Sequence, residues 1–147
     1  MKEQDAKTVN TTALAYMGDA VYEVAVRKYM LETGQVNGDK LHKLTIGFVR
    51  AEGQALAIKT LMKELTPEEQ ALVRRARNKK TTSKPQNVDP VIYKLATAFE
   101  ALAGWLYLSG DAERLRWLVG QSIGIISRSK GSYPVRQKPV PQEKRKT

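Results

Sequence analysis

Cysteine is absent from this sequence, and histidine occurs once, as His42. Without cysteine the chain can form no disulfide, no thiolate zinc site and no thiol nucleophile. With one histidine, catalysis by a Ser-His-Asp or Cys-His arrangement has little to draw on, and we interpret His42 as a capping or packing residue. No GxxxxGK[ST] loop is present, which argues against a nucleoside triphosphatase.

Long apolar runs are also missing. The N-terminal segment MKEQDAKTVN carries acidic residues and no apolar stretch, so it does not resemble a signal peptide. No apolar run approaches the roughly 18 to 20 residues that a membrane span requires, and we expect no membrane partner. Together with the lack of cysteine, these features predict a cytoplasmic protein. With 147 residues and 41% hydrophobic side chains, the chain can form one domain with a normal core.

The net charge of +10 is concentrated in two segments. Residues 74–84 (RRARNKKTTSK) hold six Lys/Arg and no acid, and residues 128–147 hold seven Lys/Arg and one acid. The rest of the chain is therefore slightly acidic. Local basicity of this kind is typical of a surface that binds a polyanion such as a nucleic acid. The alternative is that basic tails and solvated helix ends only aid solubility.

Apolar residues recur at helical spacing, whereas no Asn-Gly or Asp-Gly turn separates alternating runs as in a β-hairpin. The expected helices cover about 12–32, 39–63, 67–79, 89–108 and 112–128. The apolar residues of the first helix include Leu14, Met17, Val21 and Val24. Thr11 or Thr12 is its expected N-cap, and Thr66 is expected to form a capping box with Glu69 before the third helix.

Two polar segments divide the chain. Residues 80–90 (KTTSKPQNVDP) hold two prolines and are predicted to form a loop. Residues 129–147 hold three prolines and almost no core-forming side chains, so we expect a disordered basic tail. The predicted fold is all-α, with about five to six helices in one domain over residues 1–128.

Two acidic residues stand out because they lie in the middle of the two most apolar helices. Asp19 follows Gly18 in the segment AYMGDAV, and Glu100 lies in the segment ATAFEALAG. Asp is a mediocre helix former, and Gly18 costs roughly 1 kcal/mol relative to Ala. Small neighbours let two helix backbones approach closely, which would bring Asp19 and Glu100 together.

Two carboxylates at close range raise one pKa unless a divalent cation keeps both ionised. Oxygen ligands without histidine or cysteine suit Mg²⁺ or Mn²⁺ rather than zinc. Such an ion can activate water and stabilise the charge on a phosphodiester. The alternative is that Asp19 and Glu100 are exposed positions on amphipathic helices. Glu23 and Arg27, four residues apart, are expected to form an ordinary salt bridge.

Two motifs resemble the ribonuclease III family. Residues 14–21 (LAYMGDAV) are similar to its signature, which reads roughly LEFLGDAV. Residues 98–108 (AFEALAGWLYL) are similar to its second motif, roughly DTFEALIGAxYL, and about 80 residues separate the two motifs. The intervening chain, including Arg-Asn-Lys at 77–79, looks most like the short form of the family, mini-ribonuclease III. The resemblance covers about residues 10–128.

Two acids of the family pattern are replaced, because the first-motif glutamate falls on Ala15 and the second-motif aspartate on Thr97. The short form shares these losses and is an active nuclease. The double-stranded-RNA-binding domain of full-length members is not found in this sequence. The resemblance implies that Asp19 and Glu100 are the catalytic and metal-binding acids, with Mg²⁺ or Mn²⁺ as cofactor. Glu23 has no counterpart in the family's acid set.

The resemblance also implies a ribonuclease III-type catalytic domain over residues 1–128 that cleaves double-stranded RNA as a homodimer. The signature helices of two protomers would pack together, and each protomer would cut one strand. Interface residues would include Tyr16, Met17, Ala20 and Val21; the alternative places some of them in the core. The implied substrate is a precursor of large-subunit (23S) ribosomal RNA.

The basic segment is the expected RNA-binding surface, because double-stranded RNA is recognised mostly through its phosphates and 2′-hydroxyls. The predicted RNA-binding residues are Arg74, Arg77, Asn78, Lys79, Lys80, Thr81, Thr82, Ser83 and Lys84. The main alternative is a non-catalytic double-stranded-RNA-binding module that needs no metal. A helical DNA-binding protein fits less well, since no helix-turn-helix recognition helix is evident.

Overall fold

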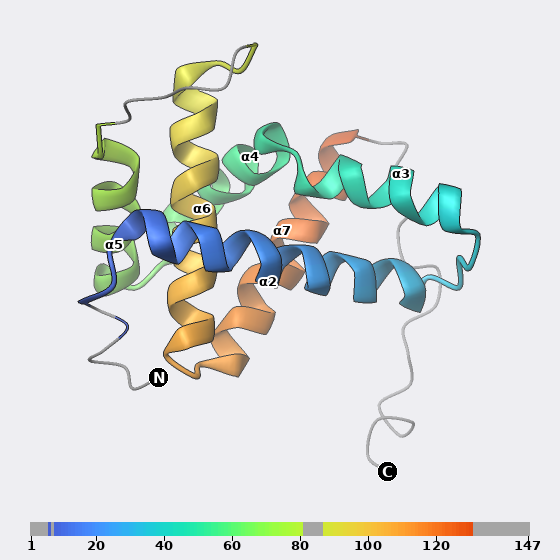
Figure 1. Cartoon of the computed structure of the whole chain (residues 1–147), viewed down its shortest axis with the longest axis horizontal. Helices are drawn as coiled ribbons and strands as arrows, with labels where there is room; N and C mark the ends of the chain where they lie inside the picture. The colour runs from blue at the N-terminus through green and yellow to red at the C-terminus, as the bar shows by residue number, and fades with distance from the viewer. Residues whose placement is uncertain (1–5, 7, 81–86, 131–147) are drawn as a thin grey trace.

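Helices account for all the regular structure of the described residues, which are residue 6, residues 8–80 and residues 87–130 of this computed structural model. They include α2 (Thr11–Glu32), α3 (Gly38–Val49), α4 (Ala51–Leu61), a 3₁₀ turn (Met62–Glu64), α5 (Pro67–Asn78), α6 (Pro90–Leu108) and α7 (Ala112–Lys130) (Figure 1). The prediction of an all-α fold is confirmed.

Helix α6 forms the centre of the fold. It packs against α2, α4, α5 and α7, and α2 crosses it in Figure 1. Because these neighbours cover it on most sides, nearly every side chain from Ala96 to Leu106 is buried, while Thr97 and Glu100 are half-buried. An ionisable side chain, Glu100, therefore lies within the buried part of the central helix.

By length and mean hydropathy, α6 is long and apolar enough to cross a membrane, and within the described residues it alone reaches that threshold. The expectation that no apolar run comes near this length is therefore wrong for α6. The central helix of a folded domain can also be this long and apolar, because other helices cover its apolar side chains. In this fold α2, α4, α5 and α7 provide that cover.

Helix α2 buries a different stripe from the one that its sequence emphasises. The buried stripe recurs every four residues at Leu14, Gly18, Tyr22, Val26 and Met30. Val24 is instead 68% exposed. Met17 and Val21 are only half-buried, so α2 carries a second apolar face outside the core. Its N-cap is Asn10, whose side chain accepts from the Ala13 backbone N at 2.9 Å, and not Thr11 or Thr12.

The prediction of one helix over 39–63 is wrong, because the chain turns at Arg50 between α3 and α4 (ψ 152°). A break leaves helix-end carbonyls without backbone donors. Two side chains satisfy them here: the Tyr22 hydroxyl donates to the Phe48 carbonyl at 3.2 Å, and Gln54 Nε2 donates to the Val49 carbonyl at 3.3 Å. The partner Tyr22 comes from α2, so the sequence of the segment itself gives no sign of it.

Other helix ends follow their sequence signals. Thr66 and Glu69 form the predicted capping box at the start of α5. Gly110, with φ 79°, follows α6, and Asp111 Oδ1 accepts from the Arg114 backbone N at 3.1 Å at the start of α7. Local hydrogen bonds suffice to fix these boundaries.

A buried ion pair joins α5 to α7. Glu69 is 3% exposed, and Arg114 donates to both of its carboxylate oxygens, at 2.9 and 2.8 Å. Arg114 also donates to the Glu64 carbonyl and lies over the Trp117 ring, 3.7 Å from its centroid. Breaking such a pair would leave a buried charge uncompensated. The cluster therefore holds α5 in place, and α5 leads directly into the basic segment.

Helix α7 reaches Lys130, two residues beyond its predicted end. The remainder of the expected basic tail, residues 131–147, lies outside the described residues. Its disorder and the domain boundary at residue 128 therefore stay predictions.

Candidate active site

Helices α2 and α6 cross in direct backbone contact because each contributes a glycine. A Cβ on Gly18 would overlap the Glu100 carbonyl oxygen, and a Cβ on Gly104 would overlap the Leu14 carbonyl oxygen. Neither contact could relax without moving a whole helix. The crossing lies at Glu100 on one helix and directly before Asp19 on the other, as expected from the small residues beside both acids.

The side chains of Asp19 and Glu100 meet at this crossing. Asp19 is exposed, Glu100 is half-buried, and the two share a hydrogen bond. Burial, followed by the charge of Asp19 and the shared hydrogen bond, raises the pKa of Glu100 from 4.5 to about 8. Without a cation, the raised pKa favours the protonated form of Glu100 at neutral pH. This geometry argues against two unrelated surface acids.

A buried amide reaches the pair from α4. Gln54 is 2% exposed, and its Nε2 lies 3.5 Å from Glu100 Oε2 as well as 3.3 Å from the Val49 carbonyl oxygen. The contact favours the ionised form of Glu100 and partly offsets the rise in its pKa. Gln54 was not among the site residues predicted from the sequence. Its signal was a long polar side chain amid small and apolar residues, but most glutamines on helices face solvent.

The donor set fits a hard divalent cation. It consists of two carboxylates, with no histidine or cysteine beside them, and no group of three or more His, Cys, Asp or Glu occurs among the described residues. Mg²⁺ keeps several waters when bound, so two carboxylates and a substrate phosphate can hold it. A cation there would favour the ionised form of Glu100, which burial and the charge of Asp19 otherwise oppose.

The raised pKa of Glu100 predicts how stability depends on pH in the absence of metal. The neutral carboxyl is favoured in the folded state, so its stabilisation is complete below about pH 4.5 and is lost as the pH rises through about 8. We expect the free energy of unfolding in EDTA to fall over this range for the wild type relative to Glu100→Gln, which cannot titrate. Urea denaturation across the range measures this.

Adding Mg²⁺ at pH 8 serves as the control for that experiment. It should stabilise the wild type more than Glu100→Gln, because the cation binds the ionised carboxylate. Parallel pH profiles of the two proteins in EDTA would contradict the assignment of a perturbed Glu100.

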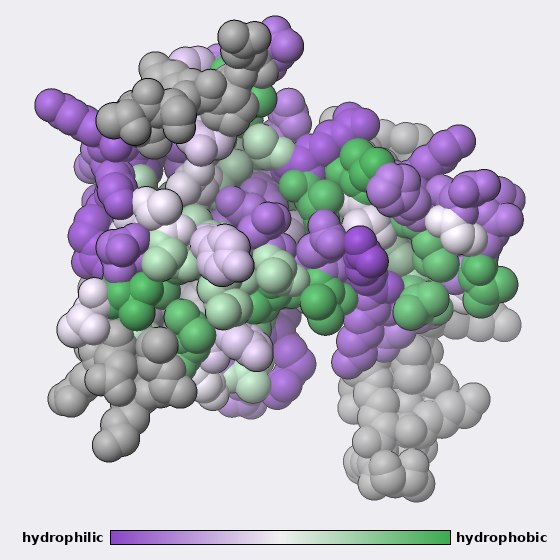
Figure 2. Space-filling view, in the orientation of Figure 1, coloured by the Kyte–Doolittle hydropathy of each residue, from purple (hydrophilic) through white to green (hydrophobic). Residues whose placement is uncertain are grey.

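The basic segment begins at Arg74 within α5, whose side of the molecule is mostly hydrophilic in Figure 2. The predicted RNA-binding residues that the structure describes are exposed or half-buried: Arg74, Arg77, Asn78, Lys79 and Lys80. Arg77 Nε donates to Asn78 Oδ1 at 3.3 Å, and Lys79 Nζ donates to Thr12 Oγ1 at 2.6 Å. The second bond attaches the end of α5 to the first turn of α2, the helix that carries Asp19.

The remaining predicted RNA-binding residues lie outside the described residues: Thr81, Thr82, Ser83 and Lys84. The RNA-binding roles of the whole segment therefore stay predictions. The structure adds that its first residues are accessible to a ligand and are tied to the N-terminal end of α2.

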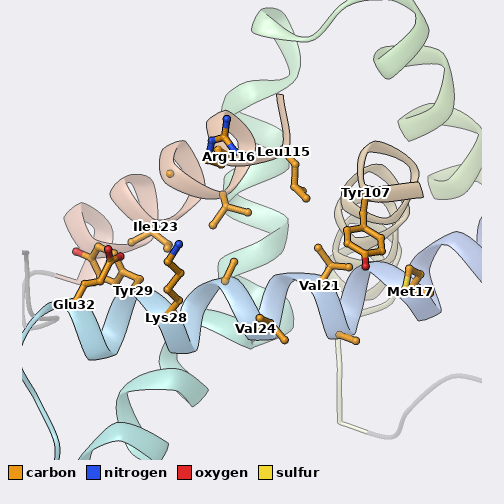
Figure 3. Close-up of a pocket in the computed structure, with 14 residues that line it drawn as sticks. Met17, Val21, Val24, Lys28, Tyr29, Glu32, Tyr107, Leu115, Arg116 and Ile123 are labelled. Atoms are coloured by element: carbon orange, nitrogen blue, oxygen red, sulfur yellow. The ribbon is translucent and has the colours of Figure 1, made fainter. Parts of the chain in front are cut away.

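An apolar groove of about 1130 Å³ runs along the outer face of α2, bounded by α7 and the end of α6 (Figure 3). Its apolar lining includes Met17, Val21, Val24, Tyr107 and Ile123. Lys28, Glu32 and Arg116 add charges to it. Val24 and Tyr107 are 68% and 54% exposed, so large apolar side chains face solvent in the isolated chain.

The four residues proposed for a protomer interface all lie outside the core. Met17, Ala20 and Val21 line the groove, and Tyr16 is 81% exposed. The alternative that some of them belong to the core is therefore wrong.

Two other sequence interpretations concern α2 and α3. The salt bridge between Glu23 and Arg27 is confirmed, with an N–O distance of 2.9 Å. His42 is exposed on α3 and lines a small pocket with Arg27 and Thr45, while the N-cap of α3 is Asn37. His42 is therefore neither the cap nor a buried packing residue.

Comparisons with known proteins agree with this architecture. A family model for the ribonuclease III domain matches residues 12–111. The chain is 42% identical to the mini-ribonuclease 3 of Symbiobacterium thermophilum (87% of this chain, 98% of that protein) and 42% identical to that of Brevibacillus brevis (84% and 92%). A crystal structure of a protein from Fusobacterium nucleatum matches with a TM-score of 0.73 and 33% identity, covering 84% of this chain and 98% of that one.

The fold and its relatives define an all-α endoribonuclease domain. The chain belongs to the ribonuclease III family. Where the motifs of the family carry two further acids, Ala15 is buried and the Thr97 hydroxyl donates to the Tyr93 carbonyl within its own helix. The site thus combines two carboxylates with the buried amide of Gln54.

Proposed function

We propose that this protein is a Mg²⁺-dependent endoribonuclease that cleaves double-stranded RNA, with Asp19 and Glu100 as its catalytic, metal-binding acids. The observation that carries the proposal is the meeting of these two side chains at the glycine crossing of α2 and α6. Mn²⁺ is expected to substitute for Mg²⁺, because oxygen ligands suit both ions.

The cation, when bound, supplies activation of water and stabilisation of the charge that develops on the phosphodiester. The protein supplies the position of the reaction. Asp19 is exposed and can be reached by an RNA backbone, whereas Glu100 is half-buried behind it. The direct contact of the two helix backbones fixes the separation of the two acids, so little reorganisation is needed when substrate arrives.

Incubation of the purified protein with a long RNA duplex tests this function directly. We expect shorter duplex products with Mg²⁺ and intact RNA with EDTA. Binding of the duplex without cleavage at any Mg²⁺ or Mn²⁺ concentration would contradict the proposal and favour the non-catalytic RNA-binding module.

The groove along α2 supports a homodimer as the active form. Its exposed apolar side chains require cover in water, and a second α2 laid along the groove would provide it. Lys28, Arg116 and Glu32 offer charges of both signs, as a self-complementary interface needs. Two protomers joined there present two sites, so that each can cut one strand of the duplex.

Val21→Asp is expected to convert the dimer to a monomer, because it places an unpaired charge in the apolar groove. Light scattering at micromolar concentration measures the change. Val91→Asp is the matched control: Val91 is 65% exposed in the first turn of α6 and does not line the groove, so that variant should stay dimeric. A wild type that is monomeric at this concentration would contradict the dimer proposal.

The basic segment is proposed to bind the RNA backbone. Replacing its cations together by alanine should weaken duplex binding and flatten its salt dependence, since each lost phosphate contact removes about one released counterion. The variant carries four substitutions: Arg77, Lys79, Lys80 and Lys84. At saturating RNA its cleavage rate should fall much less, because Asp19 and Glu100 are unchanged. Binding titrations at several salt concentrations measure the effect.

A second variant removes four positive charges elsewhere and controls for net charge. It replaces four exposed lysines of α3, α4 and the 3₁₀ turn: Lys40, Lys43, Lys59 and Lys63. Its affinity should stay closer to that of the wild type, and deletion of residues 130–147 should also have the smaller effect. Loss of binding on deletion of the tail, with the basic segment dispensable, would reverse the assignment.

The substrate that we propose is a duplex in the precursor of large-subunit (23S) ribosomal RNA, and the location is the cytoplasm. The similarity to mini-ribonuclease 3 proteins, over 84 to 87% of this chain, supports the choice of an RNA substrate. Comparing cleavage of such a precursor duplex with cleavage of a random duplex of equal length tests it.

A further inference from the structure

The break between α3 and α4 places a polar side chain next to the paired acids. Arg50 has an extended backbone there, so the carbonyls of Phe48 and Val49 at the end of α3 are left without helical backbone donors. Gln54, one turn into α4, folds back and donates to the Val49 carbonyl at 3.3 Å. Its side chain is 2% exposed, so water cannot replace its partners.

The Val49 contact fixes which way the amide of Gln54 points. A carbonyl oxygen can only accept, so the group facing it must be the NH₂ rather than the amide oxygen. That NH₂ carries two hydrogens. The second partner of Nε2 is Glu100 Oε2, at 3.5 Å. Gln54 therefore presents a donor to one carboxylate oxygen of Glu100. Asp19 lies within hydrogen-bonding range of the Glu100 side chain as well.

We infer that Gln54 is a positioning residue that holds the Glu100 carboxylate in the orientation for binding the cation. This inference rests on the proposed function of Asp19 and Glu100. The backbone of Glu100 is already fixed by its contact with Gly18, but its side chain has three rotatable bonds. The Gln54 amide is anchored at the break between α3 and α4, so its hydrogen bond to Glu100 restricts rotation about these bonds. Groups that orient metal ligands act in this way.

The break between α3 and α4 also provides a matched control, because a different side chain donates to the second of the two carbonyls, that of Phe48. The Tyr22 hydroxyl donates to the Phe48 carbonyl at 3.2 Å. Tyr22→Phe removes a donor from the break and keeps the ring that packs against Phe99. Gln54→Met also removes a donor from the break and keeps the volume, but in addition removes the contact with Glu100.

The first experiment compares Gln54→Met with Tyr22→Phe by calorimetric Mg²⁺ binding and by steady-state cleavage. We expect Gln54→Met to weaken Mg²⁺ binding and to lower kcat by about 10- to 100-fold, with KM for RNA nearly unchanged. Tyr22→Phe should leave Mg²⁺ affinity and kcat near those of the wild type. Unchanged Mg²⁺ affinity in Gln54→Met, or an equal loss in Tyr22→Phe, would overturn the positioning role.

The second experiment uses only the wild-type protein, so its result does not depend on whether a variant folds. In ¹⁵N-labelled wild type, the side-chain NH₂ signals of Gln54 should shift as Mg²⁺ is added. Those of Gln70, whose amide donates to the Met62 carbonyl at 2.9 Å, should not. Absence of a Gln54 shift while Mg²⁺ binds would overturn the inference.

Asp19→Asn and Glu100→Gln separate the two proposals. If these variants lose Mg²⁺ binding and Gln54→Met does not, only the positioning role fails. If neither Asp19→Asn nor Glu100→Gln alters Mg²⁺ binding, the metal site is elsewhere. The proposed function of the pair and the role of Gln54 then fail together.

Discussion

Asp19→Asn and Glu100→Gln are each expected to lower Mg²⁺-dependent cleavage of duplex RNA by at least about 100-fold, while the protein still folds and binds RNA. Both changes keep the size of the side chain and remove the charge that holds the cation. Because the two side chains meet at one point, neither acid can replace the other. Gel-based cleavage of a duplex, with binding measured separately in EDTA, distinguishes loss of chemistry from loss of affinity.

Glu23→Gln is the matched control for this experiment. Glu23 lies one turn after Asp19 on the same helix, but its carboxylate pairs with Arg27 at 2.9 Å. We expect near-normal cleavage from this variant, since an exposed pair contributes little to stability. Near-normal turnover in Asp19→Asn or Glu100→Gln would show that the altered residue is not a metal ligand. A loss in Glu23→Gln as large as in Asp19→Asn would extend the site along α2.

Gly18→Ala is expected to destabilise the fold by about 3 kcal/mol or more, or to prevent folding, although alanine is the better helix former. Its methyl group would overlap the Glu100 carbonyl oxygen, a backbone atom that cannot move without the rest of α6. Any protein that does fold should cleave poorly, because separating the helices also separates Asp19 from Glu100. Chemical denaturation at fixed protein concentration measures the loss.

Gly38→Ala distinguishes this steric effect from the loss of a glycine as such. Gly38 stands at the start of α3, and a Cβ there meets nothing within 4 Å. That variant should be as stable as the wild type or more so, by up to about 1 kcal/mol. If Gly18→Ala behaves in the same way, the backbone contact between α2 and α6 is not as close as the structure has it.

Local chemistry accounts for the parts of the fold that the sequence predicted well. The capping box of Thr66 and Glu69 and the predicted end of the helix over 89–108, which Gly110 follows, depend on residues within one turn of each other, so they can be recognised without a fold. The break at Arg50 could not be, because one of its two stabilising donors, Tyr22, lies 26 residues away in another helix. Gln54 was missed for a related reason: whether a glutamine is buried depends on what packs over it.

Most of the helical residues could be recognised from the sequence alone, as could the two acids beside small residues in apolar helices and the concentration of positive charge at the end of α5. Which face of α2 enters the core depends on how this helix packs against α6. Met17 and Val21 have the spacing of a core stripe, yet the fold leaves them in an open groove (Figure 3). The reason is geometric: α2 can approach α6 to backbone contact only along Gly18, and that contact turns Leu14 and Tyr22 inward and the second apolar face out.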